Sequence, residues 1–158
     1  MKIGIIIYSQ TGNTKNVAGK IQDKLQASGH TVIIEEIAIK GNIPAQPGKF
    51  ELVGIPDTES YDALIFGAPV QAISLNPVMK AYMKKLPSIS GKKAAIYVTK
   101  QIPLLWVGGT GAVAIMKKAC ESRGAEVLGT EIAVWAKNKR EQSIRRCVDN
   151  ISNLFTGW

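Results

Sequence analysis

The sequence has few of the residues that build metal centres, disulfides and hydrolytic sites. Its one histidine is His30, and its two cysteines, Cys120 and Cys147, stand apart rather than in a CxxC pair. Metal ions and redox dithiols need closer clusters. We therefore expect no metal site, and we interpret both cysteines as small core residues. A Ser-His-Asp triad would need His30, which follows Gly29 in a predicted turn where we expect it to be exposed. No catalytic side chain is predicted.

Long apolar runs and interleaved aromatic residues are also missing. No run approaches the ~18 apolar residues of a membrane span, and the opening residues carry no signal-peptide pattern. Aromatic residues make up 6% of the chain and do not alternate with its basic pairs, as platforms for single-stranded nucleic acid require. We therefore expect no membrane insertion and no nucleic-acid partner. Two isolated thiols favour the reducing cytoplasm.

Positive charge is abundant, but it is unevenly placed. Residues 1–79 carry 6 Lys and Arg against 7 Asp and Glu, a net charge of −1, and residues 80–158 carry 14 against 5, a net of +9. A basic half attracts acidic partners when it is not simply a solvated face. We interpret it as a solvated basic face that is available for docking.

Hydrophobic periodicity alternates between strand-like and helix-like segments over the 158 residues. Continuous apolar or β-branched runs predict strands, whereas apolar residues at intervals of three and four predict helices. Glycine and proline interrupt residues 40–60, which we expect to be mostly loop. The pattern predicts a single domain, residues 1–158, with an α/β fold: a doubly wound, five-stranded parallel sheet with helices on both faces. Strands are expected at 3–8, 31–39, 63–67, 93–99 and 125–136, and helices through 17–25, 77–86, 113–120 and about 139–155.

The connection between the first strand and the first helix has the composition of a phosphate site. Its residues are Ser9, Gln10, Thr11, Gly12, Asn13 and Thr14. Three hydroxyls flank a glycine, and the unpaired N–H groups of a helix start favour a dianion even without a basic side chain. This is no Walker A loop, because Gly12 has neither the partner glycine nor the following lysine. The alternative is that Ser9 and Thr14 only cap the helix.

Ser-x-Thr-Gly-x-Thr after an apolar strand resembles the FMN-phosphate loop of the flavodoxin family. The strand–helix rhythm extends this resemblance over nearly the whole chain. The resemblance implies the strand order 2-1-3-4-5 and FMN at the carboxyl ends of the strands, where strand order reverses.

The resemblance also implies that two further loops hold the isoalloxazine ring. The first contributes Pro69, Val70, Gln71 and Ala72, and the second contributes Thr99, Lys100, Gln101, Trp106 and Gly108. Trp106 is the only aromatic residue in either loop and is the candidate for ring stacking; a packing or partner contact is the alternative. For Lys100 the alternative to a role at the flavin edge is a solvated surface charge.

Three functions stay open at this point. The first is an FMN-binding, flavodoxin-like electron-transfer protein that docks on a redox protein partner. Flavodoxins are usually acidic, so the basic half of this chain implies an acidic partner or a different role. The second is an FMN-dependent oxidoreductase that uses NAD(P)H to reduce a quinone or similar acceptor, and the third is a flavin-free interaction domain. The glycines from Gly109 to Gly111 fit a dinucleotide fingerprint only loosely, and we interpret them as a turn into a helix. The sequence leaves the oligomeric state open.

Overall fold

The protein is described by a computed structural model that covers residues 1–41, 49–101 and 108–157. Within these residues the main sheet runs in the order β2-β1-β5-β7-β8, with every neighbouring pair on this path parallel. This order confirms the predicted 2-1-3-4-5 arrangement. The strands are β1 (Lys2–Ile7), β2 (Thr31–Glu36), β5 (Ala63–Gln71), β7 (Lys93–Lys100) and β8 (Glu126–Val134).

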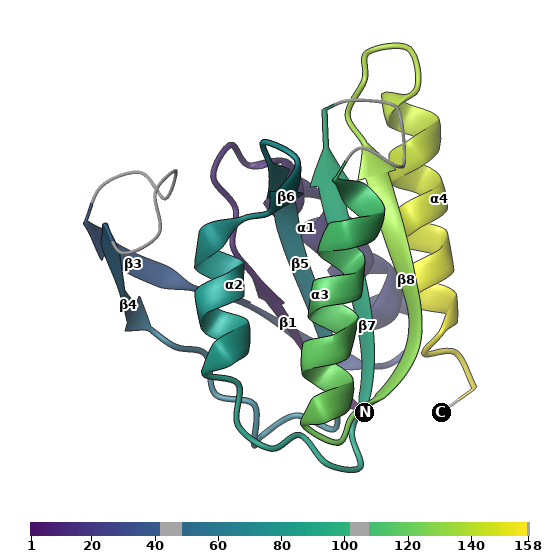
Figure 1. Ribbon diagram of the computed structural model, residues 1–158. Coiled ribbons are helices and arrows are strands. Elements are labelled where there is room, and N and C mark those ends of the chain that lie inside the picture. Colours follow the sequence, from purple (N-terminus) through teal and green to yellow (C-terminus); the bar gives the residue numbers. More distant parts are fainter. Residues whose placement is uncertain (42–48, 102–107, 158) are drawn as a thin grey trace.

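Two pairs of helices cover the two faces of the sheet (Figure 1). They are α1 (Asn13–Ala27), α2 (Pro77–Lys84), α3 (Gly109–Ser122) and α4 (Arg140–Asn153). One core lies between the sheet and α2 and α3, and a second core lies between the sheet and α1 and α4. Ile5 and Ile6 show why β1 is apolar throughout: Ile6 enters the first core and Ile5 the second, because successive strand residues point to opposite faces.

Residues 31–60 differ from the sequence-based expectation. The predicted strand 31–39 divides into β2 and β3 (Ala38–Gly41), and β3 pairs antiparallel with β4 (Phe50–Gly54) outside the main sheet. In β4, Phe50 and Leu52 are half-buried and pack against the α2–α3 core, whereas Glu51 and Val53 are exposed. This period of two forms a strand in a segment that glycine and proline made us expect as loop.

A second difference lengthens β5 at the site. The predicted strand 63–67 continues to Gln71 because β6 (Ser74–Leu75) folds back on it, pairing Val70 with Leu75 and Gln71 with Ser74. Pro69, Val70 and Gln71, which we expected in a loop, therefore belong to β5, and the last two are held in a short hairpin.

The sparse histidine and cysteine residues are structural. His30 is buried, not exposed as expected: its Nδ1 accepts from the amino terminus at 3.3 Å and its Nε2 donates to the Phe155 carbonyl at 3.1 Å. Cys120 and Cys147 are free and buried, as predicted. Burial raises the pKa of the Cys120 thiol to about 12, and it raises the pKa of Cys147 further. Among the described residues, no helix is long and apolar enough to cross a membrane.

Candidate functional site

Three loops meet in a cleft of about 110 Å³ at the carboxyl ends of β1, β5 and β7. All the residues that line it belong to the predicted set: Gln10, Thr11, Asn13, Pro69, Val70, Gln71, Thr99, Lys100 and Gln101. The fold thus brings together residues that are far apart in the sequence. Ser9, Gly12, Thr14 and Ala72 are next to these lining residues in the chain, Gly108 lies close to Val70 in space, and Trp106 lies outside the described residues.

The first loop presents backbone donors for which no described residue supplies an acceptor. Gly12 precedes α1 with φ 93° and makes no side-chain cap. Within the described residues, the N–H groups of Gly12, Asn13 and Thr14 have no hydrogen-bond acceptor, whereas the N–H of Lys15 donates to the Ser9 hydroxyl at 3.2 Å. Unsatisfied N–H groups at a helix start form an anion site.

The three hydroxyls of this loop have different surroundings. The Thr11 side chain is exposed beside the cleft. Thr14 is buried, and its hydroxyl is 2.9 Å from the Thr99 hydroxyl on β7. Tyr97 supports the same turn, because its buried hydroxyl donates to the Thr14 carbonyl at 2.7 Å. These two hydrogen bonds fix the start of α1 to β7, whereas the exposed Thr11 side chain remains accessible to a ligand.

The second loop is a tight turn supported from α2. Ala72, at its tip, has φ 56°, the one positive φ among the described non-glycine residues. The amide of Asn76 donates to the Gln71 side chain at 2.7 Å and also caps α2 by accepting from the Val78 N–H at 2.8 Å. Asn76 therefore connects the Gln71 side chain, which lines the cleft, to the start of α2. This contact holds Gln71 in place.

The third loop places a cation at the cleft. Lys100 is only 4% exposed, so the alternative of a solvated surface charge is wrong. Burial lowers the pKa of its ammonium group. Its side chain lies under the start of α3, where a Cβ added to Gly109 would stand 3.2 Å from Lys100 Cδ. Gly108 precedes α3 with φ 80° and lies against the hairpin, where an added Cβ would be 2.8 Å from Val70 Cγ1.

The chemistry of this lining favours binding over acid–base catalysis. Among its described residues Lys100 is the only ionisable group, and the other polar groups are amides, hydroxyls and backbone N–H. In the described part of the chain, no three His, Cys, Asp or Glu side chains gather where they could hold a metal ion. This lining fits a phosphorylated, partly apolar ligand. It combines the unpaired backbone N–H groups beside Thr11 with the apolar side chains of Pro69 and Val70 and the Lys100 cation.

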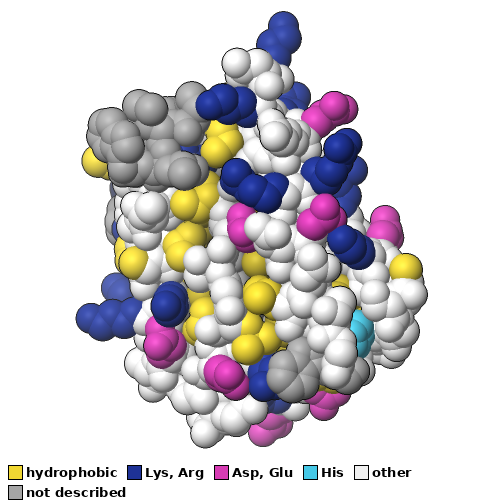
Figure 2. Space-filling view, turned by 90° about the vertical axis from the view of Figure 1, so that its right-hand side faces the viewer, with side chains coloured by type: hydrophobic (Ala, Val, Ile, Leu, Met, Phe, Trp, Pro, Cys, Tyr) yellow, Lys and Arg dark blue, Asp and Glu magenta, His cyan; other side chains and the backbone are white. Residues whose placement is uncertain are grey.

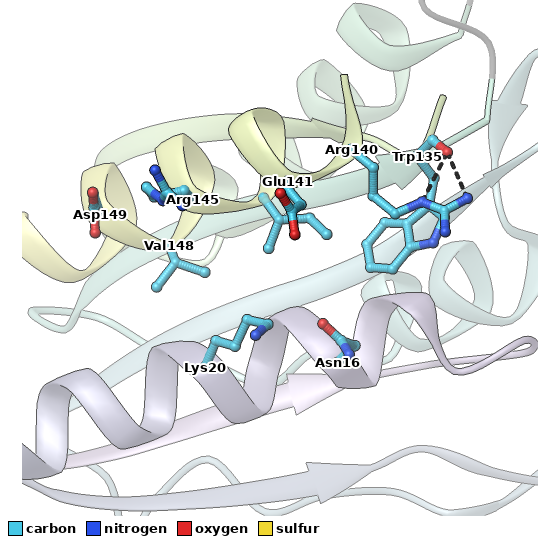
Figure 3. A pocket seen from close by; sticks show the side chains of 9 residues that line it. Asn16, Lys20, Trp135, Arg140, Glu141, Arg145, Val148 and Asp149 are labelled. Atoms are coloured by element: carbon cyan, nitrogen blue, oxygen red, sulfur yellow. Dashed lines mark hydrogen bonds between the residues drawn. The ribbon is translucent and has the colours of Figure 1, made fainter. Parts of the chain in front are cut away.

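Sequence reasoning missed a second cavity, a groove of about 480 Å³ between α1 and α4 (Figure 3). Asn16 and Lys20 line it from α1, and Trp135 closes one end just after β8. The Arg140 guanidinium donates to the Trp135 carbonyl from Nε at 3.3 Å and Nη2 at 3.2 Å, and it lies 5.7 Å from the ring centre. The signal in the sequence that could have indicated this groove was Trp135 followed by the basic segment from Lys137 to Arg140.

Two curated proteins are similar to this chain in sequence. A flavodoxin from Megasphaera elsdenii is 26% identical over 133 residues, which is 82% of this chain and 84% of that protein. An NAD(P)H dehydrogenase (quinone) from Archaeoglobus fulgidus is 25% identical over 122 residues, or 65% of this chain. That match spans 63% of the length of the archaeal protein. No family model matches the chain.

Solved flavodoxins share the fold. Oxidised flavodoxin 1 from Bacillus cereus superposes with a TM-score of 0.73 at 20% identity, covering 100% of this chain and 99% of that one. A Fusobacterium nucleatum flavodoxin bound to flavin mononucleotide gives a TM-score of 0.69 at 15% identity, covering 98% and 99%. In sequence the chain is similar to a flavodoxin, and in structure it has the flavodoxin fold.

Proposed function

We propose that this protein binds FMN in the three-loop cleft and carries electrons between redox proteins. One observation carries the proposal: the N–H groups of Gly12, Asn13 and Thr14, which find no acceptor among the described residues, stand beside Thr11 at the start of α1. The solved Fusobacterium relative holds FMN, and the curated Megasphaera relative is a flavodoxin, which supports the same ligand here. When bound, FMN supplies one- and two-electron chemistry that the side chains lack.

Each loop has a distinct role in this proposal. Ser9, Gln10, Thr11, Gly12, Asn13 and Thr14 hold the phosphate. The residues that would hold the ring are Pro69, Val70, Gln71 and Ala72 in the second loop and Thr99, Lys100, Gln101 and Gly108 in the third; Trp106, the candidate for ring stacking, lies outside the described residues. Buried Tyr97 and Thr99 keep the turn of Thr14 fixed, so little ordering cost accompanies phosphate binding. We further propose that residues 1–158 act as one domain in the cytoplasm, with an acidic redox protein as partner.

The phosphate part of the proposal is tested by comparing FMN with riboflavin, which lacks the phosphate. We expect Thr11→Val to weaken FMN by about 10- to 100-fold, because a charge-assisted hydrogen bond contributes about 1.5–3 kcal/mol. Riboflavin should change little. Quenching of flavin fluorescence measures both affinities, and Thr130→Val, at an exposed threonine of β8, is the matched control. Equal losses for FMN and riboflavin would contradict the assignment. So would a protein that is colourless after incubation with excess FMN and removal of the unbound flavin.

The archaeal relative, an NAD(P)H dehydrogenase (quinone), favours one second candidate, an FMN-dependent oxidoreductase that reduces a quinone with NAD(P)H. A steady-state assay separates the two functions. An electron carrier oxidises NAD(P)H with a quinone only when a separate reductase is added. Rapid oxidation by the purified FMN protein alone would favour the enzyme.

A further inference from the structure

We propose that the mouth of the α1–α4 groove is the docking surface for an acidic protein partner. The inference rests on the proposed function, because it concerns the partner of the same electron carrier. The surface, called here the α4 patch, consists of five exposed cations: Lys20, Arg140 and Arg145, which line the groove, and Lys137 and Lys139, which come just before α4.

The cations of the α4 patch are not neutralised within the described chain. The ion pairs formed there join Lys15 to Glu36, Lys24 to Asp149, Lys93 to Glu126 and Arg146 to Glu131, and none includes a member of the patch. Asp149 lines the groove, but it already contacts Lys24 at 2.6 Å. Glu141 is the one other acidic side chain in the lining. The patch therefore carries a net positive charge available to a partner.

The placement of these cations opposes local helix stability. Lys139 is the N-cap of α4 and Arg140 its first residue, at the helix end that carries partial positive charge. Lys139 makes no side-chain cap. Glu141 is the one acidic residue in the first turn of α4, so it offsets only part of the unfavourable effect that the three cations at 137, 139 and 140 have on local helix stability. An acidic partner would offset that local cost.

An aromatic anchor lies within the charged surface. Trp135 is half-buried, and Arg140 is held over its ring by two bonds to its carbonyl oxygen (Figure 3). Tryptophan and arginine dominate binding energy at protein interfaces, and side chains fixed in advance lose less entropy on binding. Figure 2 shows that Lys and Arg gather on the upper part of this side of the molecule, with a few acidic side chains among them. Interspersed acids suit a protein partner better than a continuous phosphate backbone.

The α4 patch is close to the proposed cofactor cleft. Asn13 lines the cleft, and Asn16, about one turn further along α1, lines the groove. On the opposite side, the Trp135 N–H donates to the Lys100 carbonyl at 2.7 Å, and Lys100 also lines the cleft. A partner seated on the patch would therefore lie beside the loops that we assign to FMN.

The test measures binding of two forms of one c-type cytochrome, the native basic form and a succinylated form whose lysines have become acidic. Titration calorimetry of the flavin-free protein at about 20 mM salt keeps screening weak. We expect the succinylated form to bind and the native form not to bind. In Lys137→Glu/Lys139→Glu/Arg145→Glu the affinity should fall about tenfold or more, because three of the five cations of the patch become carboxylates that repel the acidic partner. Thermal unfolding should show this variant to be at least as stable as the parent, because glutamate near a helix start is favourable where lysine is not.

The matched control is Lys84→Glu/Lys117→Glu/Lys118→Glu, which makes the same change in net charge at exposed positions of α2 and α3. Its affinity should stay within about threefold of the parent, a difference below 0.7 kcal/mol. The proposal is overturned if both variants lose affinity equally, if the succinylated form does not bind, or if a single-stranded oligonucleotide binds more tightly than the acidic protein. Since the protein carries no flavin in this experiment, failure of FMN to bind would refute the proposed function without altering this result.

Discussion

The hydroxyls of Thr14 and Thr99 form a buried pair that joins the start of α1 to the end of β7. A hydroxyl both donates and accepts, so each partner satisfies the other away from water. Removing one hydroxyl leaves its partner unsatisfied, whereas removing both leaves an apolar contact of similar shape. This residue-scale pair therefore supports the phosphate loop from beneath.

We expect Thr14→Val to lower the free energy of unfolding by about 1–3 kcal/mol, the cost of a buried polar group without a partner. The double variant Thr14→Val/Thr99→Val should lose less than the sum of the two single variants. Urea denaturation of the four proteins of this cycle measures the coupling. Strict additivity would contradict the buried pair.

The buried cysteines predict an alkaline loss of stability. Their pKa values are raised in the folded protein, to about 12 for Cys120, so the folded state keeps thiol protons that the unfolded state releases above about pH 9. Stability is therefore complete below that pH and falls as the pH rises, by up to about 1.4 kcal/mol per pH unit for each thiol. Cys147→Ala should remove about half of the thiol-dependent slope in urea unfolding between pH 8 and 10. An unchanged slope would contradict it.

At the scale of elements, α1 and α3 begin in the same way. Each follows a glycine with positive φ, Gly12 at 93° and Gly108 at 80°, and neither helix has a side-chain cap. The space around the two glycines differs. A Cβ at Gly12 would meet nothing within 4 Å, whereas at Gly108 it would meet Val70 Cγ1 at 2.8 Å and the Ile73 backbone at 2.9 Å.

These surroundings predict different costs for the same substitution. Gly12→Ala should destabilise the protein by about 1–2 kcal/mol through its backbone conformation alone. Gly108→Ala should cost clearly more, because overpacking adds roughly 1–3 kcal/mol and displaces the hairpin. Chemical unfolding of both variants gives the comparison. Similar losses, or a larger loss at Gly12, would show that the α3 start does not support the hairpin.

Periodicity predicted the main sheet and its helices because their cores follow clear apolar patterns, as at Ile5 and Ile6. The strands β4 and β6 escaped prediction because they are short and lie among glycine, proline and polar residues, and β3 was predicted only as the end of the strand 31–39. The cleft was predictable because its residues follow directly on the strands. The burial of Lys100 was not, because it depends on how α3 packs over β7.

Positive charge gathers on one surface of the folded molecule, and the sequence indicated only part of this distribution. Net charge changes from −1 in residues 1–79 to +9 in residues 80–158. In the fold, α1 from the first half lies against α4 from the second, so Lys20 joins a basic surface formed mainly by α4 and the residues before it. Composition predicted a basic docking face, but its location required the topology.

Both the three-loop cleft and the larger groove beside Trp135 could receive a flavin phosphate. Titration of the isotopically labelled protein with FMN, followed by amide NMR, distinguishes them most directly. The account predicts large shifts at the N–H groups of Gly12, Asn13 and Thr14, and smaller ones at the same groups with riboflavin. Shifts that centre instead on the Trp135 indole and the first turn of α4, with the N–H groups of residues 12–14 unchanged, would contradict it.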